Sequence, residues 1–98
     1  MEVNVTKGKY VSPQEAKSPK ARLDNLRVLI DKGQDNWALA EFDWDGGGKA
    51  YGLRWNGNDC EQGKGLGNPQ SNGHATWVVL PEEIVDVMKK DSSFGPLM

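Results

Sequence analysis

Two alternating segments joined by a glycine-rich turn constrain this chain more than any other feature. From Trp37 to Trp44, successive residues alternate between two faces with the two-residue period of a β-strand. Residues 45–48 are Asp-Gly-Gly-Gly, and glycine readily adopts the positive φ angles that a tight turn between antiparallel strands requires. Residues 49–55 alternate again. The sequence therefore predicts a β-hairpin with strands at 37–44 and 49–55.

The alternation also divides the large aromatic residues between two faces of this hairpin. On the first strand Phe42 and Trp44 share a face with two alanines, and that face is the better candidate for the core. Large rings can instead form a partner interface or a platform on which nucleobases stack. We expect core positions for Ala38, Ala40, Phe42, Trp44 and Trp77. The candidates for an exposed or interfacial face are Trp37, Tyr51 and Trp55.

Three further segments complete the predicted secondary structure. Residues 27–31 form a short strand-like run, but the apolar spacing upstream also fits a helix through 20–29, so both alternatives stay open. Residues 75–80 form the most β-prone run. They lead into 81–90, where a first-position proline, early acids and late lysines are typical of a helix. Its apolar stripe consists of Ile84, Val87 and Met88.

These elements predict an α+β fold. We expect a four-stranded antiparallel meander followed by a C-terminal helix, which packs on one face of the sheet through its apolar stripe. Residues 23–98 are expected to form this single domain. Residues 1–22 contain two Ser-Pro breakers and several lysines, which predicts a flexible basic arm. The arm contrasts with the net charge of −2 for the whole chain.

Composition limits the class of protein. The chain has 98 residues, of which 37% are hydrophobic, and it lacks the run of about 20 apolar residues that a membrane-spanning helix needs. Its start does not resemble a secretory signal, and a single cysteine, Cys60, cannot form an internal disulfide. We therefore expect a cytoplasmic protein without a membrane association.

The chain offers little that is typical of an enzyme. One histidine and one cysteine cannot supply a zinc cluster, so we expect no metal and no cofactor. The glycines at 63–67 surround Lys64 but lack the spacing of a phosphate-binding loop. A small enzyme would have to use His74 and the long polar stretch 56–74. That alternative is weaker than a binding function, and we expect no catalytic residues.

Several short motifs resemble the positive-cofactor-four family of transcriptional coactivators and its bacterial relatives. They are Asn-Trp at 36–37, Trp44 before the turn, Lys-Ala-Tyr-Gly-Leu-Arg-Trp at 49–55, Gly-Lys-Gly at 63–65 and Leu-Pro-Glu-Glu at 80–83. The resemblance covers about half of the chain and implies a homodimer built through the helices, with single-stranded nucleic acid along the sheets. The contact residues that it implies are Trp37, Lys49, Tyr51, Arg54, Trp55 and Lys64. Residues 67–73, with 76–77 and 80–81, also resemble small bacterial proteins that have no assigned activity.

The favoured hypothesis is thus a non-enzymatic, homodimeric module that binds single-stranded nucleic acid, as a cofactor in transcription or another DNA transaction. Its basis is the aromatic sheet together with the Gly-Lys-Gly loop at 63–65 and the basic arm. The alternative is a protein-interaction domain, in which the tryptophan face meets a partner or a second subunit.

Overall fold

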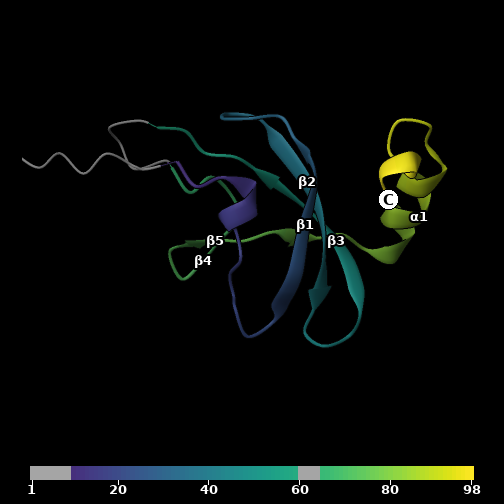
Figure 1. The fold of residues 1–98 in the computed structure, drawn as a ribbon, viewed down its shortest axis with the longest axis horizontal. Coiled ribbons are helices and arrows are strands. Elements are labelled where there is room, and N and C mark those ends of the chain that lie inside the picture. The colour runs from purple at the N-terminus through teal and green to yellow at the C-terminus, as the bar shows by residue number, and fades with distance from the viewer. Residues whose placement is uncertain (1–9, 60–64) are drawn as a thin grey trace, which may run out of the picture.

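The centre of the molecule is a four-stranded antiparallel sheet (Figure 1). The computed structural model describes residues 10–59 and 65–98. Its sheet consists, in spatial order, of β1 (Leu23–Asp31), β2 (Trp37–Trp44), β3 (Lys49–Trp55) and β6 (Val78–Val79). A helix, α1 (Glu82–Lys90), follows the last strand. The predicted α+β class, with a four-stranded antiparallel sheet and a C-terminal helix, is confirmed.

The β2–β3 hairpin has the predicted bounds and an unbroken register. Trp37 lies opposite Trp55 at its open end, and Asp43 lies opposite Lys49 beside the turn. Asp45 and two of the turn glycines have positive φ angles, as a tight turn between antiparallel strands requires. The hairpin therefore fixes the faces on which the aromatic side chains of both strands lie.

β1 is a strand, so the helical alternative for residues 20–29 is wrong. Its pairing with β2 is irregular between Asp24 and Arg27 and again between Val28 and Ile30. Asn25 lies inside the first irregularity with a φ of 53°. A bulge adds one residue to a strand and shifts the face of every later side chain. The bulge therefore separates the apolar residues Leu23 and Leu26 by three positions, a spacing that is also typical of one side of a helix.

The core lies between one face of the sheet and two segments from outside it. One is the short 3-10 helix η1 (Pro13–Glu15), and the other is the excursion between β3 and β6, which contains β4 (Gln70–Ser71) and β5 (His74–Ala75). Both lie on the same side of the sheet (Figure 1). The buried cluster consists of Ala16, Leu23, Ala38, Ala40, Phe42, Ala75 and Trp77, with Trp44 partly buried against it. The predicted core face is therefore confirmed.

Part of the segment predicted as a mobile arm packs on this core. Pro13 and Ala16 are buried, and the Trp77 indole N–H donates a hydrogen bond of 2.7 Å to the Ala16 carbonyl. The Thr76 hydroxyl donates to the Ser18 carbonyl at 2.5 Å. Residues 10–22 thus cover the core, because their backbone carbonyls satisfy side-chain donors of the segment before β6.

Helix α1 and the following 3-10 helix η2 (Gly95–Leu97) lie on the opposite side of the sheet (Figure 1). The buried residue of α1 is Val85, whereas Ile84 and Val87 remain 48% and 67% exposed. Of the expected stripe of Ile84, Val87 and Met88, only Met88 is partly buried, so the expected packing through this stripe is not confirmed. The side of the helix that carries Val85 and Lys89 faces β3, so the stripe turns away from the sheet. No helix in the described part of the chain is long and apolar enough to cross a membrane.

Gly52 sets the closest approach between the sheet and its core. A Cβ at this position would lie 2.8 Å from the Phe42 ring and 2.9 Å from the Trp77 Cβ. We predict that Gly52→Ala lowers the free energy of unfolding by about 1–3 kcal/mol through overpacking. Gly47→Ala is the matched control, because its Cβ would meet only the Trp44 carbonyl oxygen at 3.4 Å. Chemical denaturation of both variants tests this, and equal stability of the two would contradict it.

Candidate interaction face

The strands bring four of the six predicted contact residues onto one side of the sheet. The residues on the side that carries α1 are Trp37, Lys49, Tyr51 and Trp55, as the strand alternation and the register require. Arg54 has the opposite orientation and points to the core side. Lys64 lies outside the described residues. The structure therefore groups the aromatic candidates but separates them from Arg54.

Arg54 is an internal residue, with only 2% of its surface exposed. Its two terminal nitrogens donate to the backbone carbonyls of Thr76 and Leu66, and its guanidinium lies 5.8 Å from the centre of the Trp77 ring. Burial lowers the pKa of Arg54, because desolvation disfavours the charged form. Its hydrogen bonds and the cation–π contact offset this cost. The contacts of the guanidinium are therefore with the interior of the protein and not with an external ligand.

Tyr51 and Lys49 are engaged within the protein as well. Tyr51 is 4% exposed, lies beneath the Lys89 ammonium at 5.4 Å and donates its hydroxyl to the Met98 carbonyl at 3.4 Å. Lys49 and Arg27 both pair with the carboxylate of Glu41, each at 3.4 Å. Glu41 is buried, which makes this cross-strand group stronger than an isolated surface ion pair. The lysine thus already has an acidic partner.

Trp37 and Trp55 form the open part of this side of the sheet. Trp55 is 51% exposed, and Trp37 is partly buried beside the Phe94 ring, with the centroids 6.2 Å apart. A hollow of about 640 Å³ adjoins both rings. Its apolar lining includes Leu53, Pro69 and Val78. The pair of tryptophans is therefore accessible to a partner from outside.

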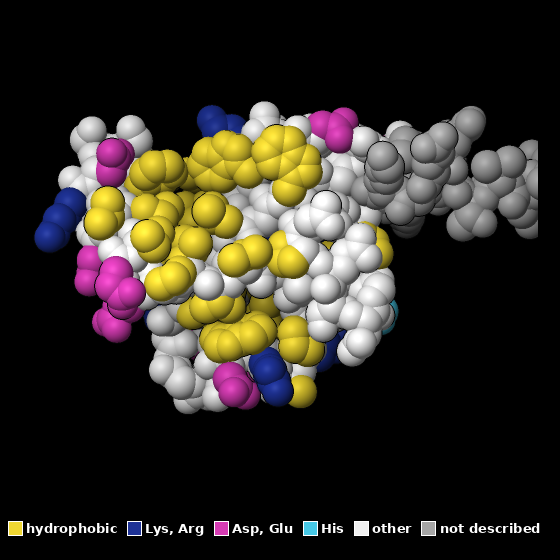
Figure 2. All heavy atoms as spheres, turned by 180° about the vertical axis from the view of Figure 1, so that it is seen from behind, with side chains coloured by type: hydrophobic (Ala, Val, Ile, Leu, Met, Phe, Trp, Pro, Cys, Tyr) yellow, Lys and Arg dark blue, Asp and Glu magenta, His cyan; other side chains and the backbone are white. Residues whose placement is uncertain are grey.

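The exposed apolar surface extends well beyond the tryptophans. Its large side chains are Trp55, Val78, Ile84, Val87 and Leu97, which we call the apolar face. Val78 belongs to this side because it lies directly opposite Leu53, two residues along β3 from Trp55. The other three residues lie on α1 and η2. Figure 2 shows hydrophobic side chains gathered into one broad patch on the side of the molecule that this view presents.

Sequence patterns missed most of this face. Four neighbouring apolar residues on α1, at 84, 85, 87 and 88, form an arc that is too wide for one contact with a sheet. The width of this arc indicates in the sequence that part of it stays exposed. The spacing of the residues alone does not show which part is buried. Val78 is exposed because β6 has only two residues and is the edge strand beyond β3.

The acidic and basic side chains of α1 are separated along the helix. Glu82 and Glu83 lie in the first turn of α1, and Lys89 and Lys90 lie in the last turn, so both ends match the helix dipole. Among residues 10–59 and 65–98, no group of three or more histidine, cysteine or acidic side chains is placed to hold a metal ion.

Comparison of this chain with protein-family models, curated proteins and solved structures finds no match. The resemblance to the positive-cofactor-four family therefore stays a prediction, and the face has to be interpreted from its own chemistry.

The internal role of Arg54 has a measurable consequence. We predict that Arg54→Met lowers the free energy of unfolding by about 2–3 kcal/mol, because the carbonyls of Thr76 and Leu66 lose their donor while they remain enclosed. Arg22→Met is the control, since Arg22 is exposed and its ion pair with the exposed Asp45 carboxylate, at 4.0 Å, is weak. We expect its free energy of unfolding to change by no more than about 0.5 kcal/mol. Urea denaturation followed by tryptophan fluorescence measures both. A stable Arg54→Met variant would show that the contacts contribute little.

Proposed function

We propose that this chain is a non-enzymatic protein-interaction domain whose apolar face binds a second copy of the chain. The observation that carries the proposal is the exposure of five large apolar side chains on the α1 side of the sheet. Figure 2 shows hydrophobic side chains gathered in a broad patch, and exposed apolar surface of this kind is uncommon on monomers and typical of interfaces. A small domain also gains stability when a second copy covers such a surface.

The order of charges on α1 favours a second copy over an unrelated partner. Glu83 and Lys90 are seven residues apart and lie on the same side of the helix, next to Val87. When two α1 helices pack antiparallel about a twofold axis, Glu83 of each copy lies beside Lys90 of the other. The two ion pairs then flank an apolar contact made by Ile84 and Val87 of both copies. The helix is thus complementary to itself.

The same face is less suited to the phosphate backbone of a nucleic acid. Arg54 is buried, Lys49 is paired with Glu41, and α1 begins with two acids. Phosphate contacts require lysine or arginine side chains that are free to replace counterions. These features support the protein-interaction proposal over the nucleic-acid proposal.

Charge reversal on α1 tests the self-association. In sedimentation equilibrium, we predict that Glu83→Lys and Lys90→Glu each weaken the dimer about tenfold, because each substitution creates two repulsive contacts per dimer. The double variant restores the attraction and recovers most of the affinity. Val87→Asp removes the apolar contact and yields a monomer. Glu15→Lys, on η1 at the opposite side of the sheet, is the control and leaves the dimer unchanged.

A monomer at millimolar concentration would overturn the proposal. A dimer that Val87→Asp and both reversals leave unchanged would place the interface elsewhere and overturn it equally.

Binding of single-stranded nucleic acid is a second candidate, favoured by one observation. Trp55 is half exposed and lies directly opposite Trp37, which gives two neighbouring indoles at the open end of the hairpin. Base stacking on such rings contributes about 1–3 kcal/mol per base. In this case an oligothymidylate quenches tryptophan fluorescence in a salt-dependent way, and Trp55→Ala weakens binding at least about fivefold. Fluorescence and electrophoretic mobility that stay unchanged at micromolar protein would exclude this candidate.

A further inference from the structure

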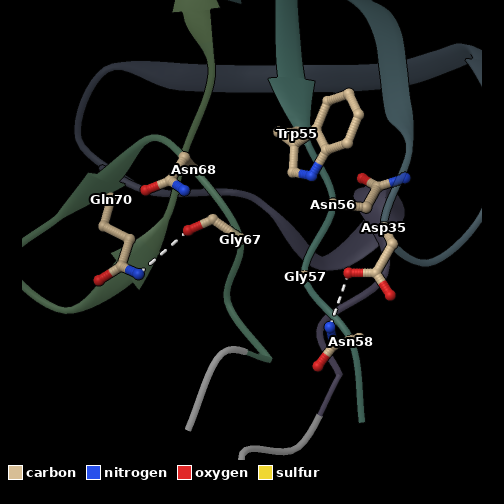
Figure 3. A pocket seen from close by; sticks show the side chains of 8 residues that line it. All are labelled: Asp35, Trp55, Asn56, Gly57, Asn58, Gly67, Asn68 and Gln70. Atoms are coloured by element: carbon tan, nitrogen blue, oxygen red, sulfur yellow. Dashed lines mark hydrogen bonds between the residues drawn. The ribbon is translucent and has the colours of Figure 1, made fainter. Parts of the chain in front are cut away.

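A second hollow lies beside Trp55, and its lining is polar (Figure 3). Its volume is about 450 Å³, within the range of small-molecule sites. The lining comes from three places: the turn between β1 and β2, the residues directly after β3, and the segment that leads into β4. Its side chains are those of Asp35, Trp55, Asn56, Asn58, Asn68 and Gln70. Four carboxamides and one carboxylate thus surround the edge of an exposed indole.

Asn56 gives this polar cleft a buried and directed acceptor. The residue has no exposed surface, and its Nδ2 donates to the Gly33 carbonyl at 2.8 Å and to the Asp31 carboxylate at 3.2 Å. Its Oδ1 has no hydrogen-bond partner among the described residues. Both neighbours of Nδ2 are acceptors, so the amide cannot be turned over to pair the oxygen. Figure 3 shows this oxygen on the side of Trp55, with the nitrogen turned away.

Asn58 repeats the arrangement at the other end of the cleft. Its Nδ2 donates to the Asp35 carboxylate at 2.6 Å, which fixes the amide orientation (Figure 3). Its Oδ1 is also buried and without a partner within the described part of the chain. Gln70 uses its Nε2 in a 3.0 Å bond to the Gly67 carbonyl. The side-chain amide N–H groups of Asn56, Asn58 and Gln70 therefore bind the protein, and among the residues that the structure describes the buried unpaired atoms of the cleft are the two acceptor oxygens of Asn56 and Asn58.

The walls of the cleft are held together by the backbone. Trp55 and Asn68 exchange two N–H to carbonyl bonds, each of 2.8 Å. Gly67 has a φ of 65°, and a Cβ there would overlap the Trp55 carbonyl oxygen and crowd the Gly57 nitrogen. The segment at Gly67 and the end of β3 are thus so close that no side chain larger than that of glycine fits between them. A site with fixed walls loses little entropy when it binds a ligand.

The unpaired acceptors determine which ligand the cleft fits. Two buried carbonyl oxygens and a carboxylate favour a ligand that brings hydrogen-bond donors over phosphate and other anions. Hydroxyl groups can donate hydrogen bonds to these oxygens and carry no charge. A cationic ligand would instead have to be neutralised by the single carboxylate of the cleft. The half-exposed Trp55 ring offers a flat apolar surface beside these acceptors. A pyranose combines a flat C–H face with a rim of hydroxyls.

We propose that this cleft binds a neutral sugar residue, which stacks on Trp55 and donates its hydroxyls to Asp35, Asn56 and Asn58. The three acceptor residues Asp35, Asn56 and Asn58 lie outside the apolar face, and Trp55 is the one residue that the cleft and this face share. The charge-reversal variants at Glu83 and Lys90 keep all three acceptors and Trp55, so sugar binding persists when the dimer is weakened, and Asp35→Asn leaves the dimer unchanged. Failure of either proposal is therefore recognised separately.

Nuclear magnetic resonance of the full chain tests the sugar site. The probes are methyl glycosides of glucose, galactose, mannose and N-acetylglucosamine, titrated to 50 mM, about the limit for weak binding. For at least one glycoside we expect saturable shifts of the Trp55 indole and of the Asn56 and Asn58 side-chain amides. Asp35→Asn weakens binding at least tenfold, because it replaces an ionic acceptor of the hydroxyls. Asp24→Asn, at an exposed position on β1, is the matched control and leaves binding unchanged.

Nuclear Overhauser contacts between sugar C–H protons and the Trp55 ring in the unaltered chain keep the test independent of any variant's folding. The absence of saturable shifts with every glycoside would overturn the proposal. Shifts at the same amides with tetramethylammonium or inorganic phosphate, but not with a glycoside, would overturn it as well.

Discussion

The buried guanidinium of Arg54 is the interaction on which the rest of the structure depends. A charge inside a small domain needs hydrogen-bond partners, and here the two terminal nitrogens donate to backbone carbonyls of Thr76 and Leu66, while Nε has no partner among the described residues. These carbonyls lie near the two ends of residues 65–77, the second described stretch of the excursion between β3 and β6. One side chain thus ties this excursion to the central hairpin. Because neighbours on a strand point to opposite faces, anchoring Arg54 inside leaves Trp55 on the open side.

The two sides of the sheet are completed in different ways. On the core side, Phe42 and Trp77 approach Gly52 so closely that a methyl group would not fit, and the N-terminal segment closes the remaining space. On the other side, α1 contributes only Val85 as a buried residue. The residue of α1 that covers Tyr51 is Lys89 and not one of the apolar residues of the helix. Part of the apolar arc of α1 therefore remains exposed to water. The apolar face follows from this off-centre position of the helix.

The sequence predicted what depends on local periodicity and turn chemistry. The hairpin at 37–55, its core face and the helix after Pro81 all follow from residue spacing. For β1 the sequence predicted only the part at 27–31, because an inserted residue such as Asn25 changes the period on which strand recognition relies. The packing of residues 10–22 and the burial of Arg54 depend on carbonyls that are distant in sequence. The polar cleft was missed for the same reason, since Asp35, Asn58 and Gln70 meet only in the folded chain.

Trp55 lines both the apolar hollow and the polar cleft, and this double position explains why a small domain leaves such a large ring half exposed. Leaving an indole in water forgoes burial energy of about 25 cal/mol per Å² of apolar surface. The backbone that carries the ring is nevertheless fixed, because it pairs with Asn68 on one side and Trp37 on the other. A large ring that stays partly in water on a fixed backbone is characteristic of recognition surfaces. A change at Trp55 therefore affects both surfaces, so only residues confined to one of them, such as Val87 or Asp35, can show which surface a given ligand or partner occupies.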